Sequence, residues 1–374
     1  MDSFRFISQW ISHDRRLSDD VIKTPPDQVE NVEKPGGDPQ KEETINVDQP
    51  LWPQDTYLGR WRHFAFITDC RTILVSTEKL LAAKKLCEDY KGMVDSGLDQ
   101  EKIGITREEI IYAKKLRDSS FHPDNGELTN VIGRMSFQFP GCVFITGGML
   151  AFYKSAKAVL GWQFFNQSFN AVVNYTNRNA KSDSEGDANV VKQAFICATV
   201  ASCGAALGFR KLLAGRGPLF ARWAPFFAVA MGNMTNLPIM RQREIARGIE
   251  LSSKDDAESP LMCSQLAAVK AIGECVITRI VMAAPGMIFI PVIMNGIKPY
   301  CFYQTRPWIG LPIEIALCSA ILLIMIPSAL AIYPQRNSLN VALLKLIPEE
   351  YDEFQEKAQR KQLDLNILYY NKGL

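Results

Sequence analysis

The last apolar stretch of the chain, from Ile315 to Gln335, reads IALCSAILLIMIPSALAIYPQ and holds no charged residue. Four other uncharged, apolar-rich stretches come before it, at Met135–Tyr153, Gln193–Phe209, Trp223–Met240 and Ile280–Ile297. Each is about as long as a helix must be to cross the roughly 30 Å of a bilayer core. One such stretch would fit a buried core helix, but five in succession, bounded by Lys, Arg or Glu, are hard to explain in water. The pattern therefore predicts an all-α membrane protein with about five transmembrane helices and with its termini on opposite sides of the bilayer.

The rest of the chain differs sharply in composition. Residues 1–50 are rich in Pro, Asp, Glu and Lys and hold few apolar side chains, which predicts a disordered tail. Residues 51–134 are expected to form a soluble helical N-terminal region, residues 135–335 the transmembrane body, and residues 336–374 a polar or amphipathic C-terminal segment. The balance of 42 Lys and Arg against 40 Asp and Glu excludes a strongly basic nucleic-acid-binding protein. The expected partners are a lipid bilayer and no nucleic acid.

The N-terminal region contains two short local signals. Thr106 and Glu109 have the spacing of a capping box and predict the start of a helix. The second signal is a tight turn predicted at His122–Glu127, because Pro favours the second turn position and Asn-Gly favours the positions after it. A histidine with two carboxylates nearby could instead serve acid–base catalysis or hold a metal, but the absence of a second nearby histidine favours the structural turn. The residues of this turn are His122, Pro123, Asp124, Asn125, Gly126 and Glu127.

The sequence carries little that indicates an enzyme, a cofactor or a metal. No glycine-rich pattern of the phosphate- or dinucleotide-binding kind follows a predicted strand. The nine cysteines form no CxxC pair, and their odd number, with only three histidines in the chain, argues against a zinc site or a disulfide framework. We therefore expect a protein that is not an enzyme and that needs no cofactor or metal.

Asparagines recur at helical spacing in the segment between the first two predicted spans. Asn166, Asn170, Asn174 and Asn177 lie at i, i+4, i+8 and i+11, which places them in one stripe, with Gln167 beside it. Neutral amides both donate and accept hydrogen bonds, so the stripe suits a zwitterionic ligand that crosses a membrane. An amphipathic helix lying among the lipid headgroups, with its amides in water, explains the spacing equally well.

A second candidate element lies at the end of the third predicted span. Pro238 removes a backbone donor there, and Asn233 and Asn236 come just before it. Transporters use interrupted helices to present backbone groups to a substrate. Arg241 follows and could hold a carboxylate through its guanidinium fork. The alternative is a plain span end with arginines at the interface.

Arg279 lies just before the fourth predicted span, five residues after Glu274. A charge inside a bilayer is costly unless it pairs or reaches the interface, which makes Arg279 a functional candidate. Because it is so close to the end of the span, we expect its side chain to extend to the interface instead.

Several of these segments resemble motifs of the sideroflexins, also called the tricarboxylate carrier family. The family signature HPDTGE is similar to His122–Glu127, with Asn125 in place of threonine. The pattern NxPxMRQRE matches Asn236–Glu244. Further matches are Ile145–Met149, the asparagine-rich segment Asn166–Asn179, Arg279–Met287 and the closing Tyr370–Leu374. The resemblance covers the chain from about residue 50 to its C-terminus.

The resemblance implies a multi-pass carrier of the mitochondrial inner membrane for small neutral amino acids, with serine the leading substrate, which supports one-carbon metabolism. It also implies that the N-terminal part lies in the matrix. The alternative function that the resemblance implies is that of a non-transporting assembly or scaffold protein of the inner membrane. The residues expected to bind the substrate come from the physical argument above and not from the family: Asn166, Gln167, Asn170, Asn174, Asn233, Asn236 and Arg241.

Overall fold

The computed structural model describes residues 44–97, 104–122, 125–152, 155–176, 184–215, 217–254, 259–361 and 365–372. The chain divides into two compact units. The first consists of Met1–Leu51 and Val75–Asp118, and the second of Trp52–Leu74 and Ser119–Leu374. Most of the tail expected over residues 1–50 lies outside the described residues.

The first unit is built on two helices, α3 (Thr77–Asp95) and most of α5 (Arg107–Ser120). The capping box at the start of α5 forms as the sequence predicts. The Thr106 N–H donates to Glu109 Oε2 at 2.8 Å, and the Glu109 N–H donates to Thr106 Oγ1 at 3.3 Å. On α3 the buried side chains recur at helical spacing: Leu80, Ala83, Cys87 and Tyr90.

The last residues of the expected tail pack onto this helix pair. Ile45 and Val47 are buried, and the Ile45 N–H donates to the Tyr90 hydroxyl at 3.0 Å. Lys114 Nζ donates to the Val47 carbonyl at 2.6 Å. Residues 44–50, at the end of the segment expected to be disordered up to about residue 50, are therefore held against α3 and α5. Two apolar side chains and a few specific hydrogen bonds hold a segment whose average composition is polar.

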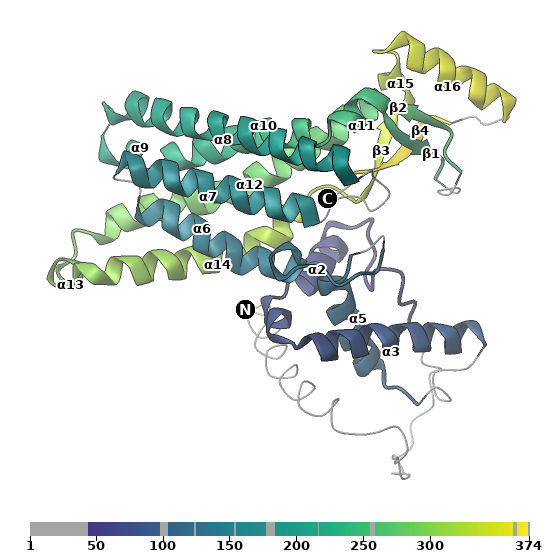
Figure 1. The fold of residues 1–374 in the computed structure, drawn as a ribbon, viewed down its shortest axis with the longest axis horizontal. Coiled ribbons are helices and arrows are strands. Elements are labelled where there is room, and N and C mark those ends of the chain that lie inside the picture. Colours follow the sequence, from purple (N-terminus) through teal and green to yellow (C-terminus); the bar gives the residue numbers. More distant parts are fainter. Residues whose placement is uncertain are drawn as a thin grey trace. The chain divides into compact units, whose positions relative to one another are not determined.

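The second unit contains most of the helices, and Figure 1 shows the long ones running side by side. The fold class expected from the sequence, an all-α membrane protein, is confirmed. The α-helices are α2 (Tyr57–Ile67), α6 (Gln138–Ala151), α7 (Ala156–Thr176), α8 (Ser184–Ala214), α9 (Pro218–Ala221), α10 (Ala224–Met240), α11 (Gln242–Arg247), α12 (Gln265–Ile297), α13 (Cys301–Thr305), α14 (Gly310–Leu330), α15 (Val341–Leu344) and α16 (Pro348–Arg360).

Each of the five predicted spans falls on a helix: α6, α8, α10, α12 and α14. Among the described residues, three helical stretches are long and apolar enough to cross a membrane, namely Asn189–Leu213, Gln265–Ile297 and Pro307–Leu330. Met135–Ala151 is a shorter apolar stretch. The helix that holds the fourth predicted span begins at Gln265 instead of Ile280, because tertiary partners satisfy the charged residues in its first half.

The packing of the long helices sets one face of α7 against the rest of the bundle. Helices α7 and α10 both lie along α8, while α12 lies along α14 and α10. Helix α6 packs on α14 and also contacts α7. The amides of α7 can therefore face other helices and not only the surroundings of the bundle.

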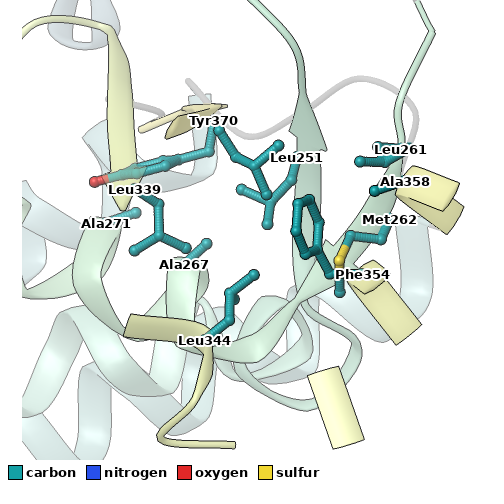
Figure 2. Packing of buried hydrophobic residues seen from close by; sticks show 11 residues of the cluster. Leu251, Leu261, Met262, Ala267, Ala271, Leu339, Leu344, Phe354, Ala358 and Tyr370 are labelled. Atoms are coloured by element: carbon teal, nitrogen blue, oxygen red, sulfur yellow. The ribbon is translucent and has the colours of Figure 1, made fainter. Parts of the chain in front are cut away.

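A small antiparallel sheet, which the sequence analysis did not predict, joins the long loop before α12 to the C-terminal segment. Its strands β1 (Ile249–Ser252), β2 (Met262–Ser264), β3 (Arg336–Asn340) and β4 (Ile367–Asn371) are arranged in the order β2-β1-β4-β3. Leu251 pairs with Tyr370, and Asn337 pairs with Tyr370 on the other side of β4. Figure 2 shows the core beneath the sheet, where Phe354 of α16 packs with Leu251 and Met262.

Candidate functional site

Three amide side chains of α7 are buried inside the bundle. Gln163, Asn166 and Gln167 lie at i, i+3 and i+4, and so share one face of the helix. Their exposed fractions are 0%, 8% and 1%. These amides are enclosed by protein, whereas a helix lying among headgroups would present them to water. Asn170 and Asn174 continue this row toward the end of α7 and are half-buried.

Gln167 lies where three helices meet. A Cβ placed on Gly232 of α10 would come within 2.2 Å of Gln167 Nε2 and 3.3 Å of Ser202 Cβ on α8. A glycine at this position thus leaves room for the amide between α10 and α8. Asn233, the next residue on α10, is also buried. Within the described part of the chain, polar side chains from α7, α8 and α10 are brought together here.

Several polar atoms of this cluster have no hydrogen-bond partner among the described residues. They are Gln163 Oε1, Asn166 Nδ2 and both amide atoms of Gln167. Gln163 Nε2 donates to Met149 Sδ at 3.4 Å, a weak acceptor. A buried polar atom without a partner costs free energy, so each of these atoms would be stabilised by a polar group beside it.

Toward the end of α7 the row joins a chain of hydrogen bonds across three helices. Arg279 Nη2 of α12 donates to Asn174 Oδ1 at 3.1 Å. Asn174 Nδ2 then donates to Asn236 Oδ1 of α10 at 3.0 Å. Asn236 is buried, and its Nδ2 has no partner in the described structure. The chain therefore ends in a buried donor.

This arrangement differs from the sequence-based expectation for Arg279. We expected its side chain to extend to the membrane interface. Instead, Arg279 reaches across to Asn174 on α7. Glu274, five residues earlier, accepts from the Tyr370 hydroxyl at 3.0 Å and from Asn337 Nδ2 at 2.8 Å. Arg279 lies 15 residues into a helix that is longer than the predicted span, so it is not at a helix end.

The described hydrogen bonds of Arg241 go to residues other than the amides of α7. Its guanidinium pairs with Glu244 and donates from Nη1 to the Lys372 carbonyl at 2.8 Å. It thereby ties the start of α11 to the end of the chain. Helix α10 continues through Pro238 to Met240, and α11 begins at Gln242. The helix is thus interrupted at Arg241 and not at Pro238.

The predicted turn at residues 122–127 forms. The Gly126 N–H donates to the His122 carbonyl, and the His122 N–H donates to the Glu127 carbonyl, both at 2.9 Å. Gly126 has φ of 66°, and Asn125 Oδ1 accepts from the Glu127 N–H at 3.0 Å. His122 is buried. Pro123 and Asp124 lie outside the described residues, as does Asn177 of the asparagine stripe.

Two groups of polar residues were missed by the sequence analysis. Gln163 lies on the same face as Asn166, three residues earlier, and extending the stripe toward the start of α7 would have found it. Arg222 and Glu314 form a buried ion pair between the turn before α10 and the first part of α14. Glu314 is a single acidic residue within the apolar stretch Pro307–Leu330, which was the available signal.

Two comparisons with known proteins identify the same family over most of the chain. A protein-family model described as Sideroflexins matches residues 46–374. The chain is 44% identical over 332 residues to Sideroflexin-2 of Drosophila melanogaster, and 43% identical over 331 residues to Sideroflexin-2 of Homo sapiens. It is 42% identical over 331 residues to Sideroflexin-1 of Homo sapiens. Each alignment covers 88% of this chain and 98% of the relative. No solved protein structure matches the chain.

Proposed function

The chain belongs to the sideroflexin family, and from this premise we propose that it carries small neutral amino acids, above all serine, across the mitochondrial inner membrane. The proposed role is to supply serine to one-carbon metabolism in the matrix. The protein would then act as a carrier and not as an enzyme.

The observation that carries this proposal is the row of buried amides on α7. Gln163, Asn166 and Gln167 are enclosed by the helix bundle and keep unpaired donors and acceptors. A zwitterionic amino acid has a cationic end that needs acceptors and an anionic end that needs donors. Neutral amides supply both without adding a net charge to the bilayer core, where an additional ion would be costly.

The length of the row suits a path better than a single pocket. From Gln163 to Asn174 is eleven residues of helix, or about 16 Å at a rise of about 1.5 Å per residue. That distance is several times the length of a small amino acid. A substrate that has lost its water can therefore exchange hydrogen bonds with successive amides along α7, and no single position needs to hold it tightly.

The test of the carrier function is an uptake panel with purified full-length protein in liposomes. Radiolabelled serine, alanine and glycine are compared with glutamate, lysine and citrate. We expect saturable uptake of the small neutral amino acids, with serine the best substrate. Citrate uptake in place of serine uptake would contradict the substrate class. Uptake no faster than in protein-free liposomes for every compound would contradict the carrier function and favour a scaffold role.

A further inference from the structure

Arg279 is a cation inside a membrane-spanning helix, and no carboxylate pairs with it in the described part of the chain. Its hydrogen bond goes to the neutral amide of Asn174. Glu274 of the same helix is engaged by Tyr370, Asn337 and Lys270. A charge on a membrane-spanning helix is costly without a counter-charge, so an arginine whose described hydrogen bond goes only to a neutral amide can bind an anionic group of the substrate.

A second donor lies at the other end of the same hydrogen-bond chain. Asn236 uses Oδ1 to accept from Asn174, while its Nδ2 is buried without a partner among the described residues. Arg279 and Asn236 thus both have N–H groups to offer, and Asn174 bonds to both. A carboxylate has two oxygens that only accept hydrogen bonds, and it can replace the Asn174 oxygen as the acceptor for Arg279.

We propose that Arg279 and Asn236 form the subsite that binds the carboxylate of the transported amino acid. Asn170 lies one helical turn before Asn174 on the same face of α7, and we assign to its amide oxygen the role of accepting from the ammonium group. The inference rests on the carrier function proposed above. It assigns to Arg279 the role that the sequence suggested for Arg241.

The contacts of Arg241 and Arg279 support the assignment of the carboxylate to Arg279. Arg241 already pairs with Glu244 and with the Lys372 carbonyl, so the protein itself satisfies its guanidinium. Arg279 has a neutral partner that a substrate can displace without leaving an unpaired acid. An arginine fork binds both oxygens of a carboxylate, which a lysine ammonium does less specifically.

The first experiment measures preference for a carboxylate. Serine and serinol, which replaces the carboxylate with a second hydroxymethyl group, are compared as competitors of radiolabelled serine uptake. Their stabilisation of the purified protein against heat gives a readout independent of transport. Wild type should prefer serine by at least about tenfold, because a site built to bind a charged group rejects an analogue that lacks it. In Arg279→Gln the preference should fall to near one, and Arg279→Lys should keep part of it.

Two arginines serve as comparisons. Arg243→Gln, at an exposed position on α11, should keep the wild-type preference. Arg241→Gln should lower thermal stability and also keep the preference. If Arg279→Gln prefers serine as strongly as wild type does, the inference is overturned, and so it is if Arg241→Gln loses the preference instead. A wild-type protein that transports no amino acid would contradict the proposed carrier function itself, so the two failures are distinct.

A second variant tests the subsite without removing the arginine. Asn174→Asp places a carboxylate at the atom that Arg279 now contacts. The new side chain should occupy Arg279 and lower the apparent affinity for serine at least about tenfold, measured on protein that folds to the same yield as wild type. Wild-type serine kinetics in Asn174→Asp would contradict the assignment.

Discussion

The amide of Gln167 occupies the space that a side chain at Gly232 would fill: a Cβ on Gly232 would lie 2.2 Å from Gln167 Nε2. We therefore expect Gly232→Ala to fold, because the far end of a glutamine can move, but to displace the amide from its place between α10 and α8. Serine uptake should fall several-fold at equal protein abundance. Gly204→Ala on α8, where an added Cβ meets nothing within 4 Å, is the matched control. Equal uptake by both variants would exclude a role for Gln167 in the path.

Glu274 holds the C-terminal strand β4 against helix α12. It accepts from the Tyr370 hydroxyl and from Asn337, and burial raises the pKa of Tyr370, so the tyrosine remains a protonated donor. Glu274→Ala removes the acceptor of both donors, and it should lower the free energy of unfolding by about 1–3 kcal/mol for each of them. Glu274→Gln keeps an acceptor and should cost less. Thermal unfolding of the purified protein measures both, with the exposed pair Lys357–Glu353 as the control that costs little.

The buried ion pair between Arg222 and Glu314 should behave asymmetrically on mutation. Glu314→Met removes the carboxylate that Arg222 contacts in this buried pair and should destabilise the protein by about 3–5 kcal/mol. Replacing both residues with methionine removes both charges and should restore most of that loss. Melting temperatures of the single and double variants check this. A double variant as unstable as Glu314→Met would show that the charges are not coupled.

Gly126 adopts a positive φ that β-branched residues avoid. Gly126→Val should therefore lower protein abundance, because the turn that closes on the His122 and Glu127 backbone becomes strained. His122→Ala should keep serine uptake per folded molecule within a few-fold. Normal abundance with lost uptake in His122→Ala would instead indicate a direct role for the histidine in transport.

The features predicted correctly from sequence depend on neighbours along the chain. Uncharged runs such as Ile315–Gln335 could be predicted as helices because hydropathy and length are read directly from neighbouring residues. The capping box of Thr106 and Glu109 and the turn at Asn125–Gly126 could be predicted because their hydrogen bonds span only two to five residues.

The features that the sequence analysis missed depend on packing between distant segments. Strand β1 pairs with β4, so that Leu251 lies opposite Tyr370, and neither short strand has a pattern that identifies the other. The fourth predicted span began at Ile280, whereas α12 begins at Gln265, and Glu274 in the first half of this helix bonds to residues of β3 and β4. Arg279 seemed free to reach the interface because its partner Asn174 lies 105 residues away.

The most direct test of the central claim is serine uptake by Asn170→Ala and Asn174→Ala, measured in liposomes at matched protein levels. If the row on α7 handles the substrate, each change removes a hydrogen bond to a group that has lost its water. For Asn174, this is the bond that its amide makes to the substrate once the carboxylate has taken its place at Arg279. The apparent affinity should then fall about five- to a hundredfold. Asn295→Ala, an exposed amide near the other end of α12, should keep wild-type kinetics. Wild-type kinetics in Asn170→Ala and in Asn174→Ala would contradict the assignment of this row as the transport path.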